Sequence, residues 1–283
     1  MSIYSLFFFI FNPIRNQYMN QNPIGIFDSG IGGTSIWKEI NELLPFENTI
    51  YLADSAYAPY GERSKDEIIE LSIKNTEKLL ELGSKIIVVA CNTATTNAIK
   101  VLRNTYSIPF IGIEPAIKPA ALQTQTKSIG ILATKGTLSS ELFSKTSDLY
   151  TKGIKVIEII GSGLVELIES GEIYSDIMKT KLKDFLQPMI EQRIDHLVLG
   201  CSHYPYLIPV LRDILSEYIK IIDSGEAVAR QTKNVLTKEN LLSDKNSIGT
   251  NLFYSNSDIT VLKNILGSNC SLKSNCSVEF LDF

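Results

Sequence analysis

The stretch KIIVVACNTATTNAIKVLRNTY, Lys85 to Tyr106, decides the fold class. It begins with a continuous run of branched apolar residues, as in a strand buried on both faces, and a helix-length amphipathic stretch follows directly. The same alternation recurs from Pro23 onward, with apolar runs IGIF, IYLAD, PFIGIE, SIGILAT, GIKVIEII, HLVLG and IKIID. Helices of this length between strands indicate crossover connections in a largely parallel sheet. The sequence therefore predicts an α/β protein.

The composition is that of a soluble globular protein. The chain has 283 residues, of which 44% are hydrophobic and 20% charged, with a net charge of -4. Without a basic excess we expect no nucleic-acid partner, and a small or polar ligand instead. The cysteines at positions 91, 201, 270 and 276 form no CxxC pair and no metal-finger spacing. We therefore expect neither a disulfide framework nor a structural zinc site, and a reducing, cytoplasmic setting.

The N-terminus carries an apolar run, Leu6 to Phe11, that is too short to span a bilayer and lacks the basic region of a secretory signal. One interpretation is a poorly ordered extension, and another is a start assigned upstream of the true one, near Met19. A membrane tether is the third. We leave residues 1–22 out of the fold prediction and expect no membrane partner.

Two segments of the chain share one pattern. KIIVVACNTATTNAIKVLR (85–103) and DHLVLGCSHYPYLIPVLRD (195–213) both contain an apolar strand, a cysteine, two small or polar residues and a helix with VLR near its end. Chance similarity is one explanation. We interpret the pattern as a weak internal duplication of two α/β units. Each unit would present a thiol at the carboxyl end of a strand, where open α/β sheets bind ligands.

Cys91 stands between the apolar run and two residue types favoured at helix N-termini, Asn92 and Thr93. The positive end of a helix dipole lowers a thiol pKa from about 8.5 and favours the thiolate, which can act as a base or a nucleophile. Backbone N–H groups and the Asn92 and Thr93 side chains there are suited to hold a carboxylate. The alternative is the usual role of a lone cysteine, that of a small buried hydrophobe. Cys201 has the same predicted placement.

Two thiols that face one pocket leave two chemistries open. A metal would need more ligands than two sulfurs and one histidine, so redox exchange and a pair of bases on opposite faces of a substrate remain. Moving a proton from one face of a carbon to the other requires the second arrangement. His203, two residues after Cys201, is placed to assist proton movement, or is a hydrogen-bonded loop residue. His196, at the start of its strand, is predicted to be structural.

Two polar turns follow predicted strands. In IGIFDSGIGGT the glycines follow GxGG rather than the dinucleotide pattern GxGxxG, and the Asp28 carboxylate would repel a phosphate. Asp28 suits an ammonium group or a proton relay. In YLADSAYAPYGERS, Tyr60 and Gly61 can present a phenol and backbone N–H groups to a ligand, unless this is an ordinary βα loop.

Six motifs together resemble the glutamate racemases in order and spacing. They are DSGIGG (28–33), PYG (59–61), ACNTAT (90–95), LATKGTL (132–138), GCSHYP (200–205) and DSGEAVA (223–229). The resemblance runs from Ile24 to Arg230 and more faintly to the end. It implies a cofactor-independent interconversion of L- and D-glutamate that supplies D-glutamate for peptidoglycan, and hence a role in cell-wall biogenesis and cell shape.

The resemblance also assigns roles to residues. It makes Cys91 the base for D-glutamate and Cys201 the base for L-glutamate, with Asp28 and His203 assisting the two thiols. Glu169 would lie near the site, and no metal or cofactor is implied. The implied substrate-binding residues are Asp28, Ser29, Tyr60, Gly61, Asn92, Thr93, Thr134, Ser202 and His203.

The fold implied by the resemblance is a pair of similar doubly wound α/β domains with mainly parallel sheets and the active site in the cleft between them. The first domain would comprise residues 23–115 and 225–283, and the second residues 116–224, inserted into the first. We expect a homodimer. Two departures from the family pattern stand out: Ser202 replaces the usual threonine, and a cysteine-proline pair is missing near Gly161 and Ser162.

Two other functions stay open at this point. A related two-thiol racemase that acts on aspartate or another amino acid would differ in pocket size rather than in mechanism. A catalytically silent amino-acid-binding protein, such as one that binds a topoisomerase, would not need the two thiols, Asp28 and His203 together.

Overall fold

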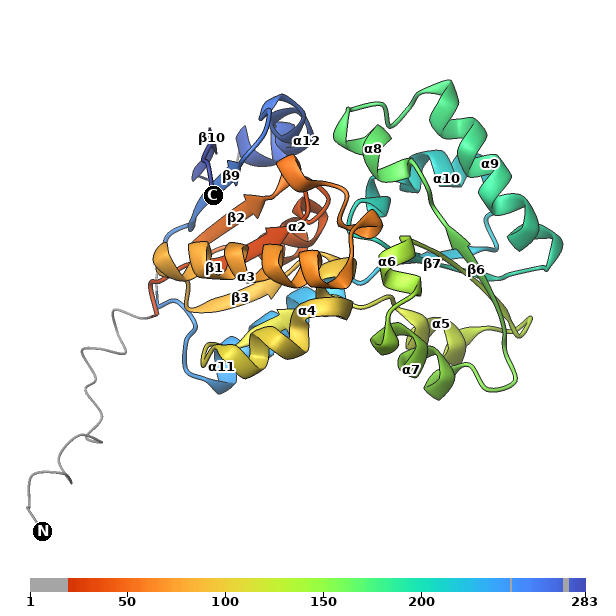
Figure 1. Cartoon of the computed structure of the whole chain (residues 1–283), viewed down its shortest axis with the longest axis horizontal. Helices are drawn as coiled ribbons and strands as arrows, with labels where there is room; N and C mark the ends of the chain where they lie inside the picture. The colour runs from red at the N-terminus through yellow and green to blue at the C-terminus, as the bar shows by residue number, and fades with distance from the viewer. Residues whose placement is uncertain (1–19, 245, 272–274) are drawn as a thin grey trace, which may run out of the picture.

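The structure, a computed structural model, describes residues 20–244, 246–271 and 275–283. It contains two sheets that lie in two halves of the molecule, side by side in Figure 1. All strand pairings among the described residues are parallel. The predicted α/β class with parallel sheets is therefore confirmed.

The six-stranded sheet takes strands from both ends of the chain, in the order β10-β9-β2-β1-β3-β4. The central strand β1 pairs with β2 on one side and β3 on the other, so the residues that follow these strands meet at one edge of the sheet. That edge carries Asp28 and Cys91. The strands are β1 (Ile24–Asp28), β2 (Thr49–Ala53), β3 (Ile86–Val89), β4 (Phe110–Gly112), β9 (Thr250–Ser255) and β10 (Asn275–Phe280).

Helices cover both faces of this sheet. Helix α11, which follows the strands of the other sheet, returns to pack on α2. The buried Trp37 of α2 meets Phe253 of β9 edge to face at 4.7 Å between ring centroids, which ties the late strand to the core. The helices are α2 (Thr34–Leu43), α3 (Lys65–Glu81), α4 (Asn92–Thr105), α11 (Gly225–Lys238) and α12 (Thr260–Ser271, interrupted at Gly267), with the 3₁₀ turns η2 (Ser55–Tyr57) and η3 (Tyr60–Glu62).

The four-stranded sheet has the order β6-β5-β7-β8. Its inner strands β5 and β7 are fully buried and end together, with Ala133 beside Gly200, so Thr134 and Cys201 follow at one edge. The strands are β5 (Ser128–Ala133), β6 (Lys155–Ile160), β7 (His196–Gly200) and β8 (Lys220–Ile222). The helices are α5 (Ile117–Gln123), α6 (Lys135–Leu138), α7 (Glu141–Tyr150), α8 (Leu164–Glu169), α9 (Asp176–Glu191), the 3₁₀ turn η4 (Tyr204–Leu207) and α10 (Ile208–Ile214).

We call these two sheets with their helices the six-stranded half and the four-stranded half. The division into domains 23–115 with 225–283 and 116–224 stays a prediction. The extension proposed for residues 1–22 lies, except for residues 20–22, outside the described residues. Within the described part of the chain, no helix is both long and apolar enough to cross a membrane.

One feature of the cysteines corrects the sequence analysis. The structure joins Cys270, in α12, to Cys276, in β10, by a disulfide, whereas the spacing gave no reason to pair them. Their Cα atoms lie 5.4 Å apart. Cys91 and Cys201 are free and buried.

Candidate active site

Cys91 caps the N-terminus of α4. The residue has extended backbone angles and α4 begins directly after it, because Asn92 and Thr93 continue into helical geometry. The backbone N–H of Ala94 donates a hydrogen bond to Cys91 Sγ at 3.4 Å. The predicted position of this thiol at the positive end of a helix is therefore confirmed.

The expectation that this position lowers the pKa of Cys91 is wrong. Burial raises the pKa of Cys91 above its ordinary value, and the nearby charge of Asp28 raises it further. The Ala94 N–H and the Ser29 hydroxyl act in the opposite direction but are outweighed. Removing a thiolate from water costs more than one helix end recovers, so Cys91 is a protonated thiol near neutral pH.

Cys201 ends its strand as predicted, but no α-helix begins there. Ser202 and His203 form a turn, and the 3₁₀ turn η4 comes next, before the short helix α10. Pro205 and Pro209 explain the difference, since neither has a backbone N–H to donate to the carbonyl four residues earlier. The expectation that Cys201 shares the helix-end placement of Cys91 is therefore corrected.

His203 provides the charged neighbour of Cys201. Its Nδ1 lies 3.8 Å from Cys201 Sγ, and its Nε2 lies 2.5 Å from Glu169 Oε1. Burial alone would lower the pKa of His203, but the contacts with Cys201 and Glu169 and the charge of Asp28 raise it well above its ordinary value. These contacts favour the protonated ring beside the sulfur, and the Gly32 N–H also lies 3.2 Å from Nε2.

Asp28 connects the two halves of the molecule. The Gly33 N–H donates to its Oδ2 at 3.0 Å within the glycine-rich turn, and the Ser202 hydroxyl of the four-stranded half donates to its Oδ1 at 3.0 Å. His203 Nδ1 lies 3.9 Å from the same carboxylate. Burial raises the pKa of Asp28, and the charge of His203 offsets part of that rise.

Glu169 has a more direct place than the resemblance implied. It ends α8, contacts His203, and accepts hydrogen bonds from the Ile31 N–H at 2.7 Å and the Ser55 hydroxyl at 3.1 Å. The glycines of DSGIGG make room for these side chains. A Cβ at Gly30 would lie 1.9 Å from Glu169 Oε1, and one at Gly32 would lie 2.2 Å from His203 Nδ1. The turn therefore needs glycine for close side-chain approach, not for phosphate.

Asn92 is the least satisfied polar group of the site. The residue is 2% exposed, and neither its Oδ1 nor its Nδ2 has a hydrogen-bond partner among the residues that the structure describes. A buried polar group without a partner costs roughly 1–3 kcal/mol. Because Asn92 lines the cavity, its amide is available to hydrogen-bond to polar atoms of a bound ligand.

The remaining predicted residues differ in how their polar groups are used. Thr93 and Thr134 hydrogen-bond to each other across the two halves at 2.8 Å. The Tyr60 hydroxyl is held by the Asp54 carboxylate and by Asn75, so its phenol is directed away from ligand binding. The substrate-binding roles of these side chains stay predictions.

The two thiols line one small cavity between the halves. Its volume is about 10 Å³, room for about one water molecule. Ten of the predicted site residues line it, while Asp28 lies behind them against Ser202. Pro59, which precedes Tyr60 in the polar turn expected to face a ligand, also lines it, and Val165 was not predicted. The lining consists of Ser29, Pro59, Tyr60, Gly61, Cys91, Asn92, Thr93, Thr134, Val165, Cys201, Ser202 and His203.

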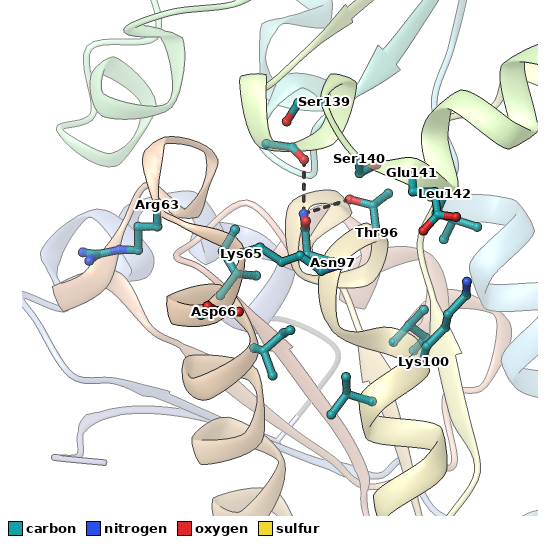
Figure 2. Close-up of a pocket in the computed structure, with 15 residues that line it drawn as sticks. Arg63, Lys65, Asp66, Thr96, Asn97, Lys100, Ser139, Ser140, Glu141 and Leu142 are labelled. Carbon is teal, nitrogen blue, oxygen red and sulfur yellow. Dashed lines mark hydrogen bonds between the residues drawn. The ribbon is translucent and has the colours of Figure 1, made fainter.

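A second, larger cavity of about 670 Å³ lies between α3 and α4 on one side and α6 and α7 on the other. Figure 2 shows Asn97 at its centre, where its Nδ2 donates to the Gly136 carbonyl at 3.1 Å. No cysteine or histidine lines it. Size alone would favour this cavity, but the two free thiols and His203 line the smaller one.

Comparison with known proteins identifies the family. Residues 24–232 match the family model described as Asp/Glu/Hydantoin racemase. The chain belongs to this racemase family. The expected resemblance is thereby confirmed, and the match spans the segments that carry both thiols.

Several racemases resemble the chain closely. The glutamate racemase of Herpetosiphon aurantiacus is 44% identical over 232 residues, 82% of this chain and 91% of that protein. The structure of Escherichia coli glutamate racemase in complex with L-glutamate and the activator UDP-MurNAc-Ala has a TM-score of 0.80 and 32% identity, covering 92% of this chain and 98% of that one. The Francisella tularensis glutamate racemase in complex with D-glutamate has a TM-score of 0.78 and 26% identity, covering 93% and 98%.

Proposed function

We propose that this chain interconverts L-glutamate and D-glutamate by a two-base mechanism in which Cys91 and Cys201 are the bases. The observation that carries the proposal is the meeting of two free thiols, one from each half, in a single buried cavity with the unpaired amide of Asn92. The relatives named glutamate racemase, and the related structures that hold L- or D-glutamate, support glutamate as the substrate.

The reaction needs one proton removed and one delivered on opposite faces of Cα. With L-glutamate bound, the Cys201 thiolate takes the α-proton, and the electron pair of the broken C–H bond is left on Cα and delocalised into the carboxylate. The Cys91 thiol then gives its proton to the other face, which yields D-glutamate and a Cys91 thiolate. With D-glutamate the two roles reverse. The protonated state of Cys91 is thus the form required for the L-to-D direction.

The charged residues near the two thiols would act on them differently. The His203 imidazolium beside Cys201 stabilises negative charge on that sulfur, and Glu169 holds the ring in place through Nε2. Asp28 lies near both Cys91 and His203, where its carboxylate can attract the ammonium group of the substrate. An ammonium there would also offset the repulsion between Asp28 and a Cys91 thiolate.

Substrate binding would use the groups around the thiols. The Asn92 amide is free to bond a substrate carboxylate, and Ser29, Thr93, Thr134 and Ser202 contribute hydroxyls around it. A cavity of about 10 Å³ is far smaller than glutamate. Binding therefore requires the two halves to separate and close again, which removes water from the reacting atoms.

We further infer that no metal or cofactor takes part, because the two thiols supply both proton transfers. The D-glutamate would feed peptidoglycan synthesis, in line with a cell-wall and cell-shape role. Cys91 and Cys201 must stay reduced to act, which favours a cytoplasmic location, whereas the Cys270–Cys276 disulfide does not favour it. A homodimer remains our expectation.

A direct assay tests the proposed function. The purified full chain is incubated separately with L-glutamate, D-glutamate, L-aspartate and the other L-amino acids, and the enantiomers are separated by chiral chromatography. We expect racemisation of glutamate in both directions, unchanged after dialysis against a chelator and a carbonyl reagent. Preference for aspartate or another amino acid, or a requirement for added metal or pyridoxal phosphate, would contradict the proposal.

A further inference from the structure

The turn that forms one wall of the substrate cavity is anchored by a buried carboxylate, Asp54, directly after β2. Asp54 is fully buried, and its oxygens make four polar contacts. Oδ2 accepts from the Tyr60 hydroxyl and from Asn75 Nδ2 at 3.1 Å. Oδ1 accepts from Lys74 Nζ at 3.0 Å and from Asn256 Nδ2 at 2.6 Å. The carboxylate therefore joins three segments that are distant in sequence.

Asn256 is the contact that comes from the C-terminal part of the chain. It follows β9, whose last residue pairs with Ala53 at the end of β2, so the sheet fixes where Asn256 lies. Besides its bond to Asp54, its Oδ1 accepts from the Ala56 N–H at 2.9 Å. One side chain thus holds both the carboxylate and the backbone of the loop that leads to the cavity.

The contacts continue from Asp54 to the cavity. The Tyr60 hydroxyl is bound to Asp54, and Tyr60 and its neighbour Gly61 both line the site of the thiols. Gly61 packs closely against the four-stranded half, since a Cβ at this position would lie 2.9 Å from Thr134 Cβ. A small displacement of the Tyr60–Gly61 turn would therefore change the cavity wall that this turn forms, and also its close contact with Thr134 in the four-stranded half.

A second contact from the C-terminal part reaches the same anchor. Lys74 Nζ lies 5.4 Å from the centre of the Phe283 ring and 4.2 Å from that of Tyr57, while it is bound to Asp54. The last residue of the chain therefore covers the lysine that neutralises the carboxylate. This contact does not involve Asn256.

We propose that Asn256 is a positioning residue for the reaction, acting through Asp54 on the Tyr60–Gly61 turn; this inference rests on the proposed glutamate racemisation. Asn256 touches no reacting atom. Loss of its side chain removes the acceptor of the Ala56 N–H and leaves Lys74 as the remaining contact of Asp54 Oδ1, and the turn loosens. Because the turn forms part of the cavity wall and contacts neither thiol's reacting proton, its displacement should weaken binding of substrate and transition state alike, and the expected signature is a higher KM with little change in kcat.

The experiment compares the wild-type chain with Asn256→Ala and Asn256→Asp. We expect Asn256→Ala to raise the KM for glutamate by roughly 3- to 10-fold, the equivalent of one lost hydrogen bond, with kcat within about twofold. Asn256→Asp should raise KM more, since it places a second carboxylate against Asp54. If Asn256→Ala is insoluble, Asn256→Ser is measured in the same way.

A matched control separates positioning from general stability. Asp258 accepts hydrogen bonds from the Thr260 N–H at 2.9 Å and its hydroxyl at 2.7 Å, at the start of α12 and two residues beyond Asn256. Asp258→Ala should lower the melting temperature and leave KM unchanged. A wild-type KM in the Asn256 variants, or an equal rise in Asp258→Ala, would overturn the inference. A wild-type chain that does not racemise glutamate would instead remove the proposed function itself, and the inference with it.

Discussion

The two strand ends that carry the thiols look alike in sequence and differ in structure. After Cys91 a helix begins at once, and a backbone N–H contacts the sulfur at 3.4 Å. After Cys201 the chain turns, and the sulfur meets the imidazole of His203 at 3.8 Å. One thiol therefore has a fixed backbone dipole as its partner, and the other has a titratable ring held by Glu169. In the proposed mechanism the two thiols would serve opposite faces of one carbon, each with a different electrostatic partner.

The largest expected effect comes from removing either of the two thiols. Cys91→Ala and Cys201→Ala should each reduce racemisation in both directions by about 10³-fold or more, because inversion needs a proton-transfer group on each face. Rates are measured by chiral chromatography. The double variant Cys270→Ser with Cys276→Ser is the control, since it removes the other two cysteines, and it should stay active. A thiol variant with near wild-type rate would show that its cysteine only packs.

A second experiment contrasts the polar neighbours of the two thiols. Asn92→Ala should raise KM roughly 10-fold or more without lowering the melting temperature, because the lost amide has partners only when substrate is bound. Ser202→Ala should lower the unfolding free energy by about 1 kcal/mol, because it removes a hydrogen bond to the buried Asp28. Stability is measured by denaturant titration. A clear loss of stability in Asn92→Ala would mean that the amide has a structural partner.

The third experiment addresses the support of His203. Glu169→Gln removes the negative charge beside Nε2, and we expect kcat/KM to fall about 10-fold. The fall must be equal in both directions, because the equilibrium constant between enantiomers is one. Glu172→Gln, on an exposed side chain three residues further, is the control. An unchanged rate in Glu169→Gln would exclude the charged ring as the partner of Cys201.

The smallest expected effect is the pH dependence of stability at the Cys201 end. The pKa of His203 is raised well above its unfolded value of about 6.5, so the protonated ring stabilises the fold fully below that pH. The contribution is lost as the pH rises through the folded pKa. The difference in unfolding free energy between the wild type and His203→Asn should therefore be largest near pH 6 and shrink in alkaline solution. A difference that grows with pH would mean that the buried ring is neutral.

Much of the fold follows from local sequence pattern. Strands such as Ile86–Val89 and His196–Gly200 are continuous apolar runs because both of their faces are buried, and such runs are visible in sequence. Strands β9 and β10 were not predicted. β9 alternates between buried and partly exposed residues, and β10 lies at the sheet edge with no buried residue, so neither forms an apolar run.

The features of the site also divide into those that a local sequence pattern predicts and those that it does not. The positions of Cys91 and Cys201 could be predicted because each directly follows an apolar strand, but their meeting depends on how the two separate sheets face each other. The contact of Glu169 with His203 could not be predicted, since it depends on how α8 packs against the turn that follows β7 within the four-stranded half. The pKa of Cys91 also escaped prediction, because burial depends on packing that no local pattern records.

The most direct test of the two-base account is α-hydrogen exchange in deuterated water, followed by mass spectrometry of each glutamate enantiomer. In the wild type, deuterium should appear in the product enantiomer before the recovered substrate. In Cys91→Ala, only Cys201 remains, and L-glutamate alone should exchange. In Cys201→Ala, D-glutamate alone should exchange. Exchange of both enantiomers in one variant, or of the same enantiomer in both variants, would contradict the assignment of one thiol to each face.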